Sequence, residues 1–166
     1  MDAYLRRALE EIERRVVPLD TAAMSRSVDG RWSACDILEH LTLAYRANAA
    51  TFEKALASGT LRARRPRLAE RVGKLLVIDL GYFPRVEAPE GTRPCGSITP
   101  DGSLAAIREA LAALDATMAR VVARFGVEPL AANHPYFAGL TVPQWRKFHW
   151  RHAVHHMRQV QERTRW

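Results

Sequence analysis

The sequence predicts an all-α protein: a four-helix bundle with a long irregular crossover between its second and third long helices. Apolar residues recur at helical spacing in four long segments, and no stretch alternates apolar and polar residues over the length of a strand. Glycines and prolines cluster between residues 81 and 100. With 166 residues, 48% hydrophobic and 26% charged, the chain has the size and composition of one globular domain spanning residues 1–166.

The first helix is predicted over residues 2–17, where Pro18 ends it and a loop over 18–32 follows. Charged residues separate the positions of its apolar stripe, which are Tyr4, Leu5, Ala8, Ile12 and Val16.

The second helix is predicted from Ser33 to about Ala57. The stretch "SACD" predicts its start, with Ser33 as N-cap and Asp36 as the acid at the third helical position. His40 lies within a quarter turn of the apolar stripe, which consists of Ile37, Leu41, Ala44, Phe52 and Ala55.

The crossover occupies residues 59–100. A short helix is predicted near 67–80, and residues 81–100 are predicted to be a loop that crosses the molecule. The third long helix follows over 102–125, ending at Gly126.

Residues 127–140 are predicted to be a further loop. The stretch "TVPQ" is a capping box, with Thr141 as N-cap and Gln144 three residues later, so the last helix should run from about Val142 to about Arg163.

The formal net charge of +7 raises the question of an anionic partner. The densest basic stretch, "LRARRPRLAERVGK" (61–74), contains six Arg or Lys, but a solvated basic face is the commoner reason for such a run. We therefore do not expect nucleic acid as a partner. No window of about 18 apolar residues exists, so we expect no membrane partner either.

Cysteine usage and the N-terminus favour a cytoplasmic protein. Only Cys35 and Cys95 are present, far apart and in no C-x-x-C pattern, as in a reduced compartment. The N-terminal stretch "MDAYLRRALEEIERR" is charged throughout, unlike a signal peptide.

Four of the six histidines fall within "FHWRHAVHHMRQV" (148–160), on the last helix. At about 100° per residue, His149, His152 and His156 point with Trp145 toward the interior, while His155 lies on the flank. A neutral buried imidazole needs partners for both ring nitrogens, and a divalent metal ion is the simplest partner that several imidazoles can share.

His152 and His156 have the i, i+4 spacing that lets two imidazoles bind one ion. A third ligand should come from a facing helix, where His40 is the one histidine on another long helix. Three histidines would leave coordination positions open, as in catalytic sites. His149 is the rival ligand, and ordinary packing without metal is the alternative.

Two neighbours of these histidines have open roles. Asp36, one turn before His40, would either orient that imidazole or complement the charge of the helix start. Gln159 follows His156 by three residues and would hydrogen-bond either a metal-bound water or a neighbouring helix.

The stretches "RWSACDILEHLTLAY" and "HAVHHMRQ" resemble the DinB/YfiT-like superfamily of helical bundles. The segment "HPYFAGLTVPQWRKFHWRHAVHHMRQV" (134–160) is more similar to an uncharacterised subgroup, the domain of unknown function 1569, although its His-Pro-aromatic stretch is one residue longer. The resemblance covers residue 30 to the end and implies a four-helix bundle with one divalent metal ion.

Carried over to this sequence, the metal ligands implied by the resemblance are His40, His152 and His156. Better-understood relatives include thiol transferases and isomerases of thiol adducts, so the resemblance implies a small-molecule substrate, with a low-molecular-weight thiol as one candidate. Relatives are often dimers, which makes a homodimer an expectation resting on resemblance alone.

The leading hypothesis is a metal-dependent enzyme in which Zn or Ni activates a water or thiol toward a small electrophile, by transfer or by hydrolysis. The catalytic acid and base are not identified. The alternative is a basic helical binding module that docks nucleic acid or an acidic partner through "RARRPR" (62–67), with the metal structural or absent.

Overall fold

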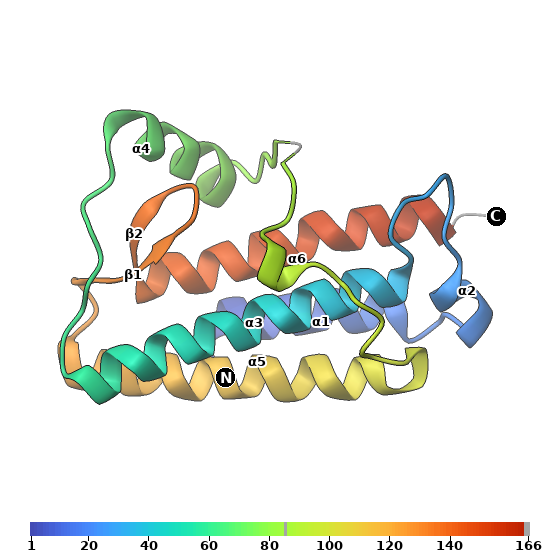
Figure 1. Ribbon diagram of the computed structural model, residues 1–166, viewed down its shortest axis with the longest axis horizontal. Coiled ribbons are helices and arrows are strands. Elements are labelled where there is room, and N and C mark those ends of the chain that lie inside the picture. The colour runs from blue at the N-terminus through green and yellow to red at the C-terminus, as the bar shows by residue number, and fades with distance from the viewer. Residues whose placement is uncertain (85, 165–166) are drawn as a thin grey trace.

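The computed structural model describes residues 1–84 and 86–164 and is mostly helical, as predicted. Its four long helices lie side by side (Figure 1) and are α1 (Ala3–Val16), α3 (Ala34–Ser58), α5 (Pro100–Phe125) and α6 (Val142–Thr164). None of the described helices is long and apolar enough to cross a membrane.

The core forms where α1 packs against α6 and α3 packs against α5. The helical stripes predicted from the sequence are the faces that become buried, because one apolar side per helix must leave water. The largest fully buried side chains include Leu5, Ile12, Ile37, Leu38, Leu41, Tyr45, Phe52, Leu111, Leu114 and Trp145.

Both predicted capping boxes are present. Ser33 Oγ accepts from the backbone N–H of Asp36 at 3.1 Å, and the Asp36 carboxylate accepts from the backbone N–H of Ser33 at 2.8 Å. Thr141 and Gln144 form the equivalent pair at the start of α6. Each pair satisfies backbone donors that the first helical turn leaves without partners.

The prediction of a loop between α5 and α6 was wrong, because a β-hairpin stands there. Strand β1 (Leu130–His134) pairs antiparallel with β2 (Ala138–Thr141). Strands this short show no readable alternation, and three consecutive residues of β2 are buried. The backbone N–H of Gly139 donates to Arg64 O at 3.0 Å, so tertiary contacts hold the hairpin.

The crossover contains more regular structure than predicted. The helix expected near 67–80 is α4 (Leu68–Lys74), continued by one π-helical turn, η1 (Leu75–Asp79). A 3-10 turn, η2 (Glu90–Thr92), interrupts the predicted loop and lies on α3. The loop expected over 18–32 also contains a short helix, α2 (Thr21–Ser25).

Candidate metal centre

Three histidines from two helices converge at one point, where His40 and His156 are buried and His152 is half-buried. His152 and His156 lie one turn apart on α6, and His40 faces them from α3. The Nε2 atom of His152 lies 3.4 Å from Nε2 of His40 and 3.0 Å from Nε2 of His156. One ligand atom from each of the three residues lies within 4.8 Å of the others.

Hydrogen bonds on the far side of two rings fix their tautomers. Nδ1 of His40 lies 2.7 Å from the carbonyl oxygen of Thr92, which can only accept, so the ring proton is on Nδ1. Nδ1 of His156 likewise donates to Oε1 of Gln159 at 2.9 Å. Both neutral imidazoles therefore present a bare Nε2 lone pair to His152.

The three converging nitrogens cannot all hydrogen-bond one another. A neutral His152 carries a single proton, so at most one proton is available where three nitrogens meet. Nδ1 of His152 is buried and has no hydrogen-bond partner among the described residues. Lone pairs that converge in this way form a set of ligand atoms that could hold a metal ion.

Burial argues against a proton as that cation. Loss of solvent lowers the pKa of His40, and it lowers the pKa of His152 and of His156 well below the ordinary value. All three imidazoles are therefore neutral near pH 7, which is the form that binds metal.

The spacing fits a small divalent ion. Nitrogen ligands at about 2.0–2.1 Å from a tetrahedral zinc ion lie roughly 3.3 Å from one another. The two Nε2–Nε2 distances, 3.4 and 3.0 Å, bracket that value. The separations of these two nitrogen pairs therefore fit a divalent metal ion bound by the residues present.

His149, the rival ligand, is not part of this group. It is fully buried, its ring lies 5.2 Å from that of Tyr45, and neither of its ring nitrogens has a hydrogen-bond partner among the described residues. Burial lowers the pKa of His149 to about 3. It lies one turn before His152, on the side toward Trp145.

His155 and His134 also lie outside the group. His155 stacks on Phe83 with ring centroids 4.7 Å apart and accepts from Nε2 of Gln159 at 3.1 Å. His134 lies in the hairpin, where its Nδ1 accepts from the backbone N–H of Tyr136. That bond makes His134 a turn-capping residue.

The structure decides the roles of Asp36 and Gln159. Asp36 closes the capping box of α3 and makes no hydrogen bond to His40. Gln159 bridges His156 and His155 through its amide, a role that neither earlier alternative included.

Sequence reasoning missed the support that the crossover gives to His40. The Glu39 carboxylate is buried and accepts from the backbone N–H groups of Gly96 at 3.0 Å and Ser97 at 2.9 Å, and from the Ser97 hydroxyl at 2.6 Å. These bonds hold the crossover on α3 and so place Thr92 O against His40. No periodic signal in the sequence links these distant segments.

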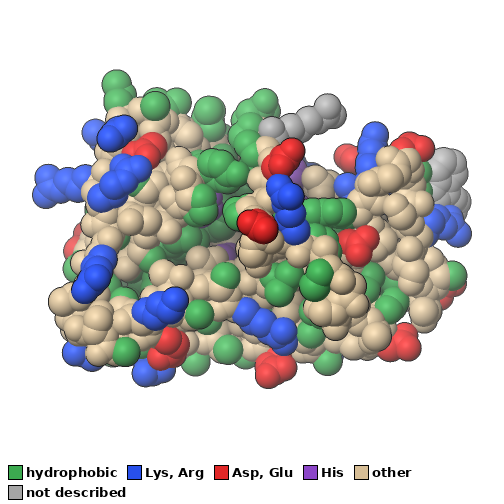
Figure 2. Space-filling view, in the orientation of Figure 1, with side chains coloured by type: hydrophobic (Ala, Val, Ile, Leu, Met, Phe, Trp, Pro, Cys, Tyr) green, Lys and Arg blue, Asp and Glu red, His purple; other side chains and the backbone are tan. Residues whose placement is uncertain are grey.

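Aromatic side chains surround the candidate metal centre. The Trp32 ring lies 5.1 Å from that of His40, while Phe83 and Phe148 stack on His152 at 5.9 and 5.3 Å. Histidine side chains are visible in a hollow between α4 and the η2 segment, with hydrophobic side chains on its walls (Figure 2). The centre is therefore largely apolar beyond the ligand atoms.

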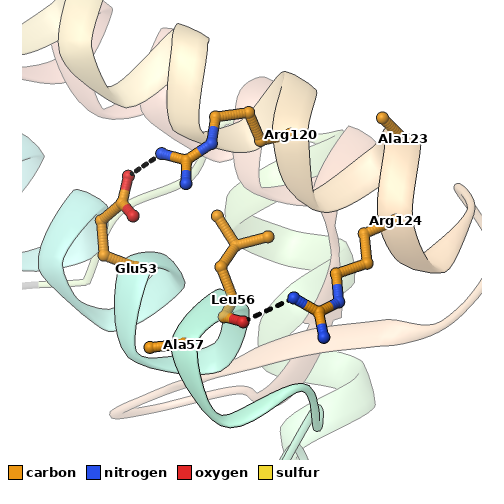
Figure 3. A pocket seen from close by; sticks show the side chains of 6 residues that line it. All are labelled: Glu53, Leu56, Ala57, Arg120, Ala123 and Arg124. Atoms are coloured by element: carbon orange, nitrogen blue, oxygen red, sulfur yellow. Dashed lines mark hydrogen bonds and ion pairs between the residues drawn. The ribbon is translucent and has the colours of Figure 1, made fainter.

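A separate groove of about 510 Å³ lies between the C-terminal halves of α3 and α5 (Figure 3). Its polar groups bond one another: Arg120 pairs with Glu53 at 2.6 Å, and Arg124 donates to Leu56 O at 2.8 Å. Among the described residues that line it, none is a histidine or a cysteine. This groove therefore offers no ligand set comparable to the candidate metal centre.

Comparison with models of protein families identifies the family of this chain. A family model described as "Protein of unknown function (DUF1569)" matches residues 5–163. The chain therefore belongs to this family. No curated protein and no solved structure matches it.

Proposed function

We propose that this protein is a divalent-metal-dependent enzyme whose ion is held by His40, His152 and His156. One observation carries the proposal: three Nε2 atoms, two of them fixed as bare acceptors by Thr92 O and Gln159 Oε1, meet in an interior that disfavours protonation. We further infer a single domain, a four-helix bundle of the DinB-like superfamily.

A bound ion would supply Lewis-acid chemistry, lowering the pKa of a water or thiol so that it attacks a small electrophile near neutral pH. The chain's own residues prepare the site. Thr92 and Gln159 hold the tautomers of His40 and His156. Trp32, Phe83 and Phe148 restrict water around the ligands.

The experiment is cobalt substitution followed by visible absorption spectroscopy. Apo-protein titrated with Co²⁺ should develop the d–d spectrum of a nitrogen-ligated ion at one equivalent per chain. Addition of a low-molecular-weight thiol should then produce a sulfur-to-cobalt charge-transfer band. The matched variants are His156→Ala, in which both signals should vanish, and His155→Ala, in which both should remain.

Addition of the thiol to the cobalt-loaded protein distinguishes thiol transfer from hydrolysis. A cobalt spectrum that a thiol leaves unchanged, together with metal-dependent cleavage of a small ester, would support hydrolysis instead of thiol transfer. Absence of any cobalt spectrum at one equivalent would refute the proposed metal centre and both reactions with it.

A further inference from the structure

The structure exposes a row of apolar side chains that runs along α4 and η1 to Leu80, the residue after η1. Eleven large hydrophobic residues are exposed among those that the structure describes, and seven of them lie between residues 68 and 86. Every fourth residue from Leu68 to Leu80 belongs to this row. We define the apolar stripe as Leu68, Val72, Leu75, Leu76 and Leu80, which are 76%, 49%, 51%, 38% and 67% exposed.

The stripe faces solvent although its helix is anchored. Arg151 donates to the carbonyl oxygen of Asp79 at 2.9 Å, and Lys147 pairs with the Asp79 carboxylate at 2.5 Å. Val77 and Ile78 are buried on the opposite side, within the π-helical turn. The outward direction of the stripe is therefore fixed by the fold.

Positive charge flanks the stripe. At about 100° per residue, Arg67, Arg71 and Lys74 fall together along one side of it, and the exposed Arg62 and Arg65 precede the helix. None of these five cations forms an ion pair with another described residue.

The acids of this region are already neutralised. Glu70 pairs with Arg64, and Asp79 pairs with Lys147. Figure 2 shows hydrophobic side chains gathered along the upper edge of the molecule, over α4, with Lys or Arg side chains at their outer end. The charge left without a partner on this face is thus positive.

We propose that this face binds the surface of an anionic lipid bilayer. An anchored helix with exposed leucines and a basic flank buries its apolar row among acyl chains while its cations contact anionic head groups. Such binding requires no spanning helix. A second copy of the chain fits less well, because a self-complementary contact would bring the same arginines near one another.

The experiment measures co-sedimentation of the metal-loaded full chain with vesicles of phosphatidylcholine, with and without phosphatidylglycerol. Wild type should bind only the anionic vesicles, and added salt should weaken the binding. Leu68→Gln with Leu80→Gln should weaken it at least tenfold. Val17→Gln with Val127→Gln, exposed apolar residues outside the stripe, is the matched control and should change it less than twofold.

The cations are tested in the same way. Arg65→Gln with Arg71→Gln should weaken binding about fivefold for each arginine removed. Arg26→Gln with Arg46→Gln removes two exposed arginines elsewhere and should have little effect. Equal losses in the stripe and control variants would contradict the proposal.

Two other results would also overturn it. Absence of vesicle binding, with a concentration-dependent dimer that Leu68→Gln and Leu80→Gln abolish, would assign the stripe to a second copy of the chain. Absence of vesicle binding, with salt-sensitive binding of DNA that needs Arg65 and Arg71, would assign the basic flank to nucleic acid.

Discussion

In the candidate metal centre, one hydrogen bond to each of His40 and His156 determines which ring nitrogen is unprotonated. The bond from His156 to Gln159 is the clearest example, because it leaves Nε2 as the ligand atom. We expect Gln159→Ala to raise the metal dissociation constant about 10- to 100-fold, because losing such a bond frees both tautomer and ring orientation. Gln161→Ala, two residues later on the outer face of α6, should leave metal binding unchanged in the same titration.

Buried neutral histidines make stability depend on pH. Burial lowers the pKa of His134 to about 3, against about 6.5 when unfolded, so the unfolded chain binds more protons between these values. The free energy of unfolding should therefore fall as pH drops below about 6.5, by up to about 1.4 kcal/mol per pH unit from this residue.

His134→Gln tests this contribution, because glutamine retains an acceptor for Tyr136 N–H but does not titrate. Urea unfolding at pH 7 and pH 5 should show a smaller difference in the variant than in wild type. An equal difference in both proteins would mean that His134 is protonated while folded or is not buried.

Among the elements around the candidate metal centre, the crossover contacts it directly, because Thr92 O bonds His40. Burial raises the pKa of Glu39, but the hydrogen bonds from Ser97 and Cys95 together outweigh it and lower the pKa below the ordinary value. We expect Glu39→Ala to cost about 3 kcal/mol of stability, since charged hydrogen bonds are lost from a buried position.

The same substitution should weaken metal binding, because it frees the segment that carries Thr92. Thermal unfolding and zinc titration measure the two effects. Glu10→Ala, on the exposed face of α1, is the control and should alter neither. Loss of stability with unchanged metal affinity would show that Thr92 does not hold His40.

The hairpin that precedes α6 makes a very close backbone contact with Arg64, in the segment before α4. A Cβ added at Gly139 would lie 2.4 Å from Arg64 O, so Gly139→Ala should lower stability by about 1–3 kcal/mol in urea unfolding. Gly91→Ala introduces a Cβ into open space and should be close to neutral. Equal stability of the two variants would contradict the docking of β2 on residue 64.

Sequence periodicity predicted the long helices because each has an apolar face several turns long, and Ser33 and Thr141 marked helix starts. It did not predict the hairpin, whose four- and five-residue strands are held by contacts with Arg64 and Trp145. It predicted α4 but not the outward direction of its leucines, which depends on bonds from α6 to Asp79.

For the molecule as a whole, helical phase predicted that His149, His152 and His156 would point inward, and the family resemblance implied the group of His40, His152 and His156. His152 and His156 face inward together, and His40 meets them from α3. The roles of Thr92 and Glu39 could not be predicted. Thr92 bonds His40, and Glu39 bonds Ser97, across more than 50 residues of sequence, and the crossover segment that contains Thr92 and Ser97 is irregular. That the three histidines bind a metal ion stays a prediction.

The most direct test is the metal content of protein purified without a histidine tag. We expect about one divalent ion per chain in wild type and in His149→Phe, and almost none in His40→Ala, His152→Ala or His156→Ala. Folding of each variant is checked by circular dichroism. Metal retained by folded His156→Ala but lost from His149→Phe would show that His156 is not a ligand, and a wild type that binds no stoichiometric metal would refute the metal centre.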